Sequence, residues 1–227
     1  MIYGNNSDVD LLGIDRVLRR GSGEILVDSE NILFVRDSVS NAFFLACKDR
    51  EAGLALLDGY SGAGCDLLAV TDYETGLEAF ERYGYSEKLE CYQVAYFGEK
   101  PRPGTGLTVR TAGEGDFPML TESYRMISPE ELAKVVARGD ILIGFYQGRP
   151  VGFVGEHLEG SMGLLYVFPE YRRRGFGTLL QMHQIARTME AGFIPFGQVE
   201  KDNLKSLNLQ KKLGMTVSDN LIVWMWK

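Results

Sequence analysis

The residues best suited to bind a ligand lie in one stretch, Leu165 to Leu180, which reads LYVFPEYRRRGFGTLL. Pro169 lacks the N–H that a strand needs, so it ends the strand before it. The arginines 172–174 lead into Gly175 and Gly177, which let the backbone approach a ligand closely. A helix then begins, and the N–H groups of its first turn have no helical partner and lie at the positive end of its dipole. This combination predicts a pyrophosphate site.

Other phosphate-binding loops fit these residues poorly. The G-x-G-x-x-G fingerprint needs a third glycine where this sequence has Leu180, and an acidic residue about 20 residues further on. A Walker loop would need Gly-Lys-Ser/Thr. A nucleotide-binding protein of another superfamily is therefore the third of three interpretations. It predicts stabilisation by ATP or NAD in preference to coenzyme A.

The elements that position this stretch follow from hydrophobic periodicity. Asn203 is a good N-cap residue, and Gly214 suits a left-handed helix stop. The predicted order is a mixed α/β (α+β) layer fold. Its elements are a strand over 107–110, helices between 116 and 138, strands over 141–146, 151–158 and 162–167, a helix over 177–190, a strand over 195–200, a helix over 204–213 and a strand over 221–226.

Composition and charge divide the 227 residues into two parts. The net charge is −7 and 45% of residues are hydrophobic, which is typical of a globular protein and excludes disorder. Residues 101–106 hold two prolines and two glycines, and we expect a linker there between domains 1–100 and 107–227. Residues 1–100 have 9 basic and 18 acidic residues, and residues 101–227 have 15 and 13. Only the second suits a polyanionic ligand.

The two parts end in a similar way. An offset of 130 residues places Gly84 on Gly214 and Asp72 on Asp202, and lays the apolar stretch 91–94 over 221–224. Both segments read as strand, Asp, amphipathic helix, Gly and apolar strand. This pattern predicts an internal repeat, with two unrelated units of one type as the alternative.

Two motifs carry a family resemblance. Arg172-x-x-Gly175-x-Gly177, after a strand and before a helix, resembles the acyl-CoA-binding motif of the GNAT superfamily of N-acyltransferases. The segment 199–215, with Asn203, Ser206 and Lys-Leu-Gly-Met at its end, is similar to that family's second motif. The resemblance covers 107–227 and leans toward the glycine N-acyltransferase-like branch. It implies two GNAT-like mixed-sheet domains in tandem, the first degenerate and unable to bind coenzyme A.

The same resemblance implies a cosubstrate site for acetyl-CoA or another acyl-CoA. Tyr166 and Val167 would bind the pantetheine arm through their backbones, and Asn203 and Ser206 would line the thiol end. Each of these residues also has an ordinary structural explanation, such as capping a helix, but jointly those explanations compete poorly. The pyrophosphate would be held by Arg172, Arg173, Arg174, Gly175, Phe176, Gly177 and Thr178.

The implied reaction is direct attack of a neutral amine on the thioester in a ternary complex. A backbone N–H near Val167 is the expected oxyanion donor. Glu156 and His157 are the candidate bases; strict alternation turns one of them into the cleft, and we prefer Glu156 because a carboxylate suits an ammonium. Many relatives have an acidic tyrosine where this chain has Gln210, which cannot donate a proton at useful pH. Either Tyr166 or water then takes that role, or this protein depends little on acid assistance.

We therefore expect a cytoplasmic acetyltransferase that transfers an acetyl or short acyl group to the amine of a small molecule or amino acid. The acidic first part favours a cationic acceptor, although charge averaged over a domain says little about one pocket. Three cysteines without a CxxC pair and two histidines predict free thiols and no metal site. No nucleic acid or membrane partner is expected, and the oligomeric state is left open. The alternative is a non-catalytic acyl-CoA sensor.

Overall fold

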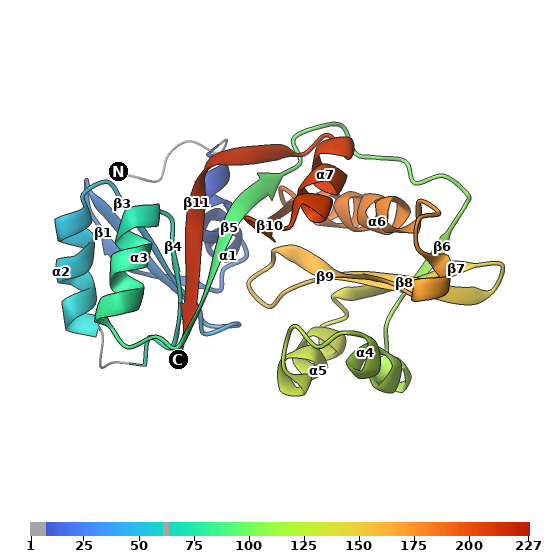
Figure 1. Ribbon diagram of the computed structural model, residues 1–227, viewed down its shortest axis with the longest axis horizontal. Helices are drawn as coiled ribbons and strands as arrows, with labels where there is room; N and C mark the ends of the chain where they lie inside the picture. Colours follow the sequence, from blue (N-terminus) through green and yellow to red (C-terminus); the bar gives the residue numbers. More distant parts are fainter. Residues whose placement is uncertain (1–7, 61–63) are drawn as a thin grey trace. The chain divides into compact units, whose positions relative to one another are not determined.

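The computed structural model describes residues 8–60 and 64–227, and its fold is mixed α/β (Figure 1). The chain forms two compact units. Unit 1 comprises residues 1–95, 198–211 and 216–227, and unit 2 comprises residues 96–197 and 212–215. These units are not contiguous in sequence, because C-terminal strand residues pair inside unit 1. The division of the sequence at 101–106 into two repeat halves stays a prediction.

Unit 1 is built on six hydrogen-bonded strands in the order β1-β2-β3-β4-β11-β5. The last strand of the chain lies between β4 and β5 and is antiparallel to both. The strands are β1 (Gly23–Asp28), β2 (Ile32–Asp37), β3 (Phe43–Cys47), β4 (Leu67–Val70), β5 (Glu87–Ala95) and β11 (Thr216–Trp226). The helical elements are η1 (Val9–Leu11), α1 (Leu12–Arg19), α2 (Arg50–Tyr60), α3 (Tyr73–Arg82) and α7 (Leu204–Lys212).

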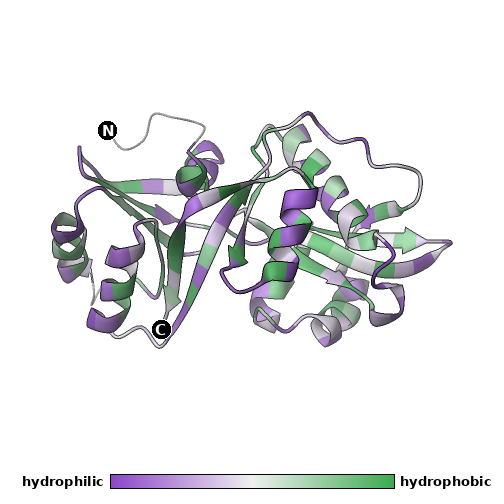
Figure 2. Ribbon diagram, turned by 45° about the horizontal axis from the view of Figure 1, so that its top comes forward, coloured by the Kyte–Doolittle hydropathy of each residue, from purple (hydrophilic) through white to green (hydrophobic). Residues whose placement is uncertain are grey.

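The core of unit 1 has one cluster on each face of this sheet. Ile14 and Val17 of α1 join Phe44 and Trp224 on one face, where the Phe44 and Trp224 rings meet edge to face at 5.5 Å. Leu54 and Leu57 of α2 and Ala79 of α3 pack with strand residues on the other face. Figure 2 shows the apolar residues concentrated along the strands. Cys47, Cys65 and Cys91 are free thiols.

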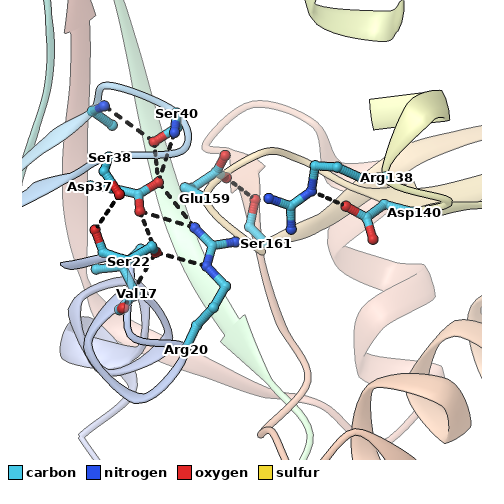
Figure 3. Close-up of polar contacts among 11 residues, drawn as sticks. Val17, Arg20, Ser22, Asp37, Ser38, Ser40, Arg138, Asp140, Glu159 and Ser161 are labelled. Atoms are coloured by element: carbon cyan, nitrogen blue, oxygen red, sulfur yellow. Dashed lines mark hydrogen bonds and ion pairs between the residues drawn. The ribbon is translucent and has the colours of Figure 1, made fainter. Parts of the chain in front are cut away.

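A buried carboxylate joins β2 to the end of α1. Asp37 is fully buried and accepts two hydrogen bonds from the Arg20 guanidinium, at 3.1 and 3.0 Å. Ser22 Oγ donates to it at 2.5 Å, and Ser40 donates through both N and Oγ (Figure 3). Burial would raise the pKa of the Asp37 carboxyl, but these hydrogen bonds and the Arg20 charge outweigh it and lower the pKa.

Replacing Asp37 by alanine should destabilise the protein by about 3–5 kcal/mol, because Arg20 loses its carboxylate partner in a buried site. Urea unfolding measures the loss. A control variant, Asp58→Ala, breaks the exposed pair with Arg82 and should cost about 0–1 kcal/mol. Because the folded pKa of Asp37 is lowered, its contribution is present above the unfolded pKa and disappears as pH falls through the folded one. Equal losses in the two variants would contradict this role.

Unit 2 is a sheet in the order β10-β9-β8-β7-β6 with helices on both faces. Two short helices precede the central hairpin, and one long helix follows it (Figure 1). The strands are β6 (Thr108–Thr111), β7 (Ile141–Tyr146), β8 (Arg149–Glu156), β9 (Met162–Val167) and β10 (Phe196–Glu200), whose last three residues belong to unit 1. The helical elements are η2 (Glu114–Asp116), α4 (Phe117–Ser123), α5 (Pro129–Ala137), η3 (Pro169–Tyr171) and α6 (Phe176–Glu190).

The long helix α6 packs on one face of this sheet. Phe176 and Leu180 form a cluster with Leu142, Val151 and Val154. The α4–α5 pair lies on the other face (Figure 1) and contacts it through aromatic rings, with Tyr124 and Phe153 at 6.2 Å. Within the described residues, no helix has the length and apolar character to cross a bilayer.

The same order of elements occurs twice along the chain. Three strands, a helix, a strand, a helix and a strand run from β1 to β5, and again from β7 to β11. The strands predicted over 141–146 and 162–167 have the observed bounds, and the helix predicted over 177–190 begins one residue earlier, at Phe176. The last strand is longer than predicted and begins at Thr216, because its first residues pair with β5 across a bulge.

Candidate functional site

Strand β9 has a free backbone edge. β10 runs parallel to it, but the two are in register only at Gly197 and Met162. Beyond that pair, no strand among the described residues is in register with this edge of β9 as far as Val167. In unit 1 the parallel strands β3 and β4 pair at three successive positions, Phe43 to Leu45. The divergence in unit 2 therefore leaves peptide groups able to bind a ligand.

The orientation of the peptide groups shows which residues face this edge. A side chain at Gly152 of β8 would come within 2.2 Å of Tyr166 O, so the Tyr166 carbonyl faces β8. The backbone N–H and C=O groups of successive strand residues point to opposite edges of the strand. Those of Leu165 and Val167 therefore face the free edge of β9, on the side of β10. The pantetheine contact expected of the Tyr166 backbone thus does not fit this register. Sequence reasoning missed Leu165, although the two-residue period of a strand would have pointed to it.

The turn after β9 has the backbone shape that its glycines predict. Arg173 and Gly175 have positive φ angles of 61° and 83°, and Gly175 occupies the N-cap position of α6. A side chain at Gly177 would meet only Val167 Cγ2, at 3.7 Å. The first turn of α6 contains no acidic residue. Its N–H groups and its dipole are therefore available to an anion.

The three arginines of this turn differ in their contacts. Arg172 Nε donates to Val167 O at 2.9 Å, and its guanidinium lies 5.4 Å from the Tyr166 ring centre. Arg174 lies over the rings of Tyr146, Tyr171 and Phe176. Arg173 is exposed, and no hydrogen bond or ion pair engages its side chain in the described part of the chain. Arg173 is thus the arginine most available to a phosphate group.

The second predicted motif begins α7 in unit 1. Asn203 Oδ1 accepts a hydrogen bond from Ser206 N at 3.0 Å, which confirms the predicted N-cap. Asn203 is exposed and Ser206 is half-buried. Gln210, four residues further along the helix, is buried, and its Oε1 finds no hydrogen-bond partner in residues 8–60 and 64–227. Buried amide oxygens are normally paired, so this atom is a candidate acceptor for a ligand group.

Glu156 at the end of β8 faces α6. Its carboxylate is buried, with the residue only 8% exposed, and accepts hydrogen bonds from Gln184 Nε2 at 3.1 Å and from Thr188 Oγ1. Both donors lie on α6. These hydrogen bonds connect the end of β8 to α6. They explain why the Glu156 carboxylate is buried, and that explanation does not require a catalytic role.

His157 faces α5, as the alternation of strand side chains requires. Its Nδ1 lies 3.9 Å from Glu131 Oε1 of α5, and its ring packs over Gly163 of β9. Burial would lower the pKa of His157, but the nearby carboxylates of Glu131 and Glu159 outweigh it and raise the pKa. Glu159 also accepts a hydrogen bond from Ser161 (Figure 3). His157 is thus a carboxylate-paired imidazole.

A tyrosine absent from our sequence prediction lies at the irregular part of β9. Leu164 has a positive φ of 51°, and the β8–β9 register shifts between Phe153 and Gly155. Burial raises the pKa of the Tyr124 hydroxyl, partly offset by a hydrogen bond from the Leu164 backbone. Tyr124 belongs to the loop after α4, where no pattern in the sequence marks it. Its neighbour Phe153 stacks on Tyr166 at 5.6 Å, so Tyr166 also faces the α4–α5 side.

The chain is similar to known acetyltransferases in sequence and fold. Residues 107–215 match the model of the acetyltransferase (GNAT) family. No curated protein matches the sequence. A structure of a GCN5-related N-acetyltransferase-like protein from Streptococcus suis is 15% identical, with a TM-score of 0.59 over 99% of this chain and 95% of that one. A GCN5-related N-acetyltransferase from Kribbella flavida is 13% identical, with a TM-score of 0.56 over 96% and 94%.

A third structure bears on the repeated element order. A tandem GNAT protein from the clavulanic acid biosynthesis pathway is 14% identical, with a TM-score of 0.52 over 96% of this chain and 86% of that one. At these identities the structures show a shared fold. Together with the family match over residues 107–215, they confirm the prediction of a GNAT-type acetyltransferase.

Proposed function

We propose that this protein transfers an acetyl or short acyl group from acyl-CoA to the amine of a small molecule or amino acid, by direct attack in a ternary complex. GNAT enzymes use an acyl-CoA as cosubstrate, and the residues of unit 2 fit one. The observation that carries the proposal is the free edge of β9, which runs directly into the left-handed turn and the N-terminus of α6.

The two ends of the cosubstrate would be held by different groups. Leu165 and Val167 offer peptide groups to the pantetheine amides. The turn 172–178 offers N–H groups to the pyrophosphate, with Arg173 beside them. Arg172 holds the end of β9 through Val167 O, so it acts as a positioning residue. Asn203 and Ser206 remain proposed neighbours of the thiol.

The amine must lose a proton before it attacks, and we assign the base to His157. Its carboxylate partner Glu131 makes the imidazole more basic, as a proton acceptor for an ammonium requires. His157 lies on the α4–α5 side, where Tyr166 and Tyr124 also lie, whereas Glu156 faces α6. The oxyanion would be stabilised by a backbone N–H of the free β9 edge near Val167.

The departing thiolate needs little acid assistance, because a thiol pKa near ~8.5 makes it a fair leaving group. Tyr166 remains a candidate acid. Tyr124 is a second one, because a tyrosine phenol is protonated at neutral pH. Either hydroxyl could supply the proton that Gln210 cannot.

The first repeat would be a degenerate acyltransferase domain. Its strands β3 and β4 pair where β9 and β10 diverge, and residues 1–100 contain no Arg-x-x-Gly-x-Gly. The repeated element order and the tandem GNAT relative support this proposal. It follows that one molecule of the protein would bind one acyl-CoA.

Turnover separates this function from the alternative of a non-catalytic sensor. We expect purified protein given acetyl-CoA and a panel of amines to release free coenzyme A thiol, followed with a thiol reagent. Calorimetry should give one bound acetyl-CoA per chain. Binding without thiol release under any acceptor would favour the sensor. Stabilisation by ATP or NAD in preference to coenzyme A would contradict both.

A further inference from the structure

A pocket of about 440 Å³ lies between α4 and α5 in unit 2. Its volume is in the range of small-molecule sites. Its wall includes Tyr124, whose ring lies 6.2 Å from that of Phe153 in β8. The other lining residues are Thr121, Arg125, Met126, Ile127, Ser128, Pro129 and Leu132.

The wall of this pocket is largely apolar, and its hydroxyl groups are already engaged. Thr121 Oγ1 donates to Phe117 O and Pro118 O, and Ser128 Oγ accepts from Glu131 N as the N-cap of α5. Met126, which also lines the pocket, is a large apolar side chain that is 80% exposed. The pocket thus suits a molecule with an apolar body.

Arg125 is the only charged residue that lines the pocket. Its guanidinium forms no hydrogen bond or ion pair with any residue that the structure describes, whereas Arg110, Arg138 and Arg172 of the same unit are all engaged. A guanidinium presents its donors as a planar fork that matches a carboxylate. An exposed, unengaged arginine beside an apolar pocket therefore favours an anionic group on the occupant.

We propose that this pocket holds the acyl acceptor, and that Arg125 selects amino acids with an apolar side chain by binding their α-carboxylate. This inference rests on the acyltransferase function proposed above, and it names the substrate class. The pocket lies on the face of the sheet where His157 and Tyr166 lie, so the α-amino group can be directed toward β9. The positive charge of Arg125 at the pocket thus disfavours a cationic acceptor, which the acidity of residues 1–100 had led us to expect.

The test compares acceptors that differ only in the carboxylate. L-leucine and L-phenylalanine are paired with isoamylamine and phenethylamine, the corresponding amines without it. Binding to the CoA-loaded protein is measured by calorimetry, and turnover by thiol release. We expect Arg125→Gln to raise the Kd and KM for L-leucine by about 10- to 100-fold. The values for isoamylamine and for acetyl-CoA should not change.

Two further variants make the result specific. Arg125→Lys keeps the charge but loses the fork, so its effect should be intermediate. Lys134→Gln removes an exposed cation from α5 that does not line the pocket, and it should bind L-leucine as the parent protein does.

Each result bears on the proposal or on the enzyme function separately. If the amines without a carboxylate bind as well as the amino acids, or if Arg125→Gln leaves L-leucine binding unchanged, the proposal is overturned. Arg125-dependent binding of L-leucine without thiol release would support the pocket assignment and contradict the transferase function. Failure to bind any member of the panel would overturn the pocket assignment, even in a protein that binds acetyl-CoA.

Discussion

Replacing Gly177 by glutamate should weaken acetyl-CoA binding by at least about 100-fold, because the new carboxylate would face the pyrophosphate across the first turn of α6. The fold should remain intact. A side chain at this position meets only Val167 Cγ2 at an ordinary distance of 3.7 Å. An acidic residue in the first turn also stabilises a helix through its dipole. Calorimetry with acetyl-CoA measures the first effect, and thermal unfolding without ligand measures the second.

Two matched variants separate charge from size at Gly177. Gly177→Gln adds nearly the same volume without charge and should bind acetyl-CoA better than the glutamate variant. Gly177→Ala adds only a methyl group and should bind nearly as well as the parent protein. If a folded Gly177→Glu protein kept its affinity, the α6 N-terminus would not be the pyrophosphate site. If both variants lost the same acetyl-CoA affinity, the cause would be the size of the new side chain and not its repulsion of the pyrophosphate.

Several elements in the second half of the sequence were predictable because their signals are local. Pro169 and the two glycines mark the end of β9 and the start of α6, and the predicted bounds differ there by at most one residue. Asn203 caps α7 through a contact three residues away, which spacing alone predicts. The turn proposed to bind the pyrophosphate was recognisable for the same reason: its backbone shape depends on residues next to each other in the chain.

Long-range pairing could not be predicted in the same way. β11 lies between β4 and β5, and nothing local in either sequence determines that a C-terminal strand pairs with residues 67–70. The choice between Glu156 and His157 as the base depends on the same kind of information. Alternation correctly separates the two side chains, but only the packing of α5 and α6 shows which face each one meets. Tyr124 was missed because its ring contact with Phe153 joins a loop to a strand 29 residues away.

His157→Gln should lower kcat by about 100-fold or more while the Kd for acetyl-CoA stays unchanged, because the amide cannot accept the proton of the ammonium. Glu156→Gln is the matched control on the adjacent residue. It changes a carboxylate that binds Gln184 and Thr188 of α6, so it should lower stability with little effect on kcat. A large loss of kcat in Glu156→Gln, with His157→Gln nearly normal, would place the base on the α6 face.

The pH dependence tests the same assignment in a variant that keeps the histidine. A base must be neutral to act, so kcat/KM should rise with pH through the raised pKa of His157. Glu131→Gln removes a negative charge that favours the imidazolium, so the pKa should fall and the rise should move to lower pH. Glu159 would still raise the pKa, so the shift should be partial. A rise that stays at the same pH in Glu131→Gln would mean that the titrating group is not His157, and the proton would then leave the amine by another path.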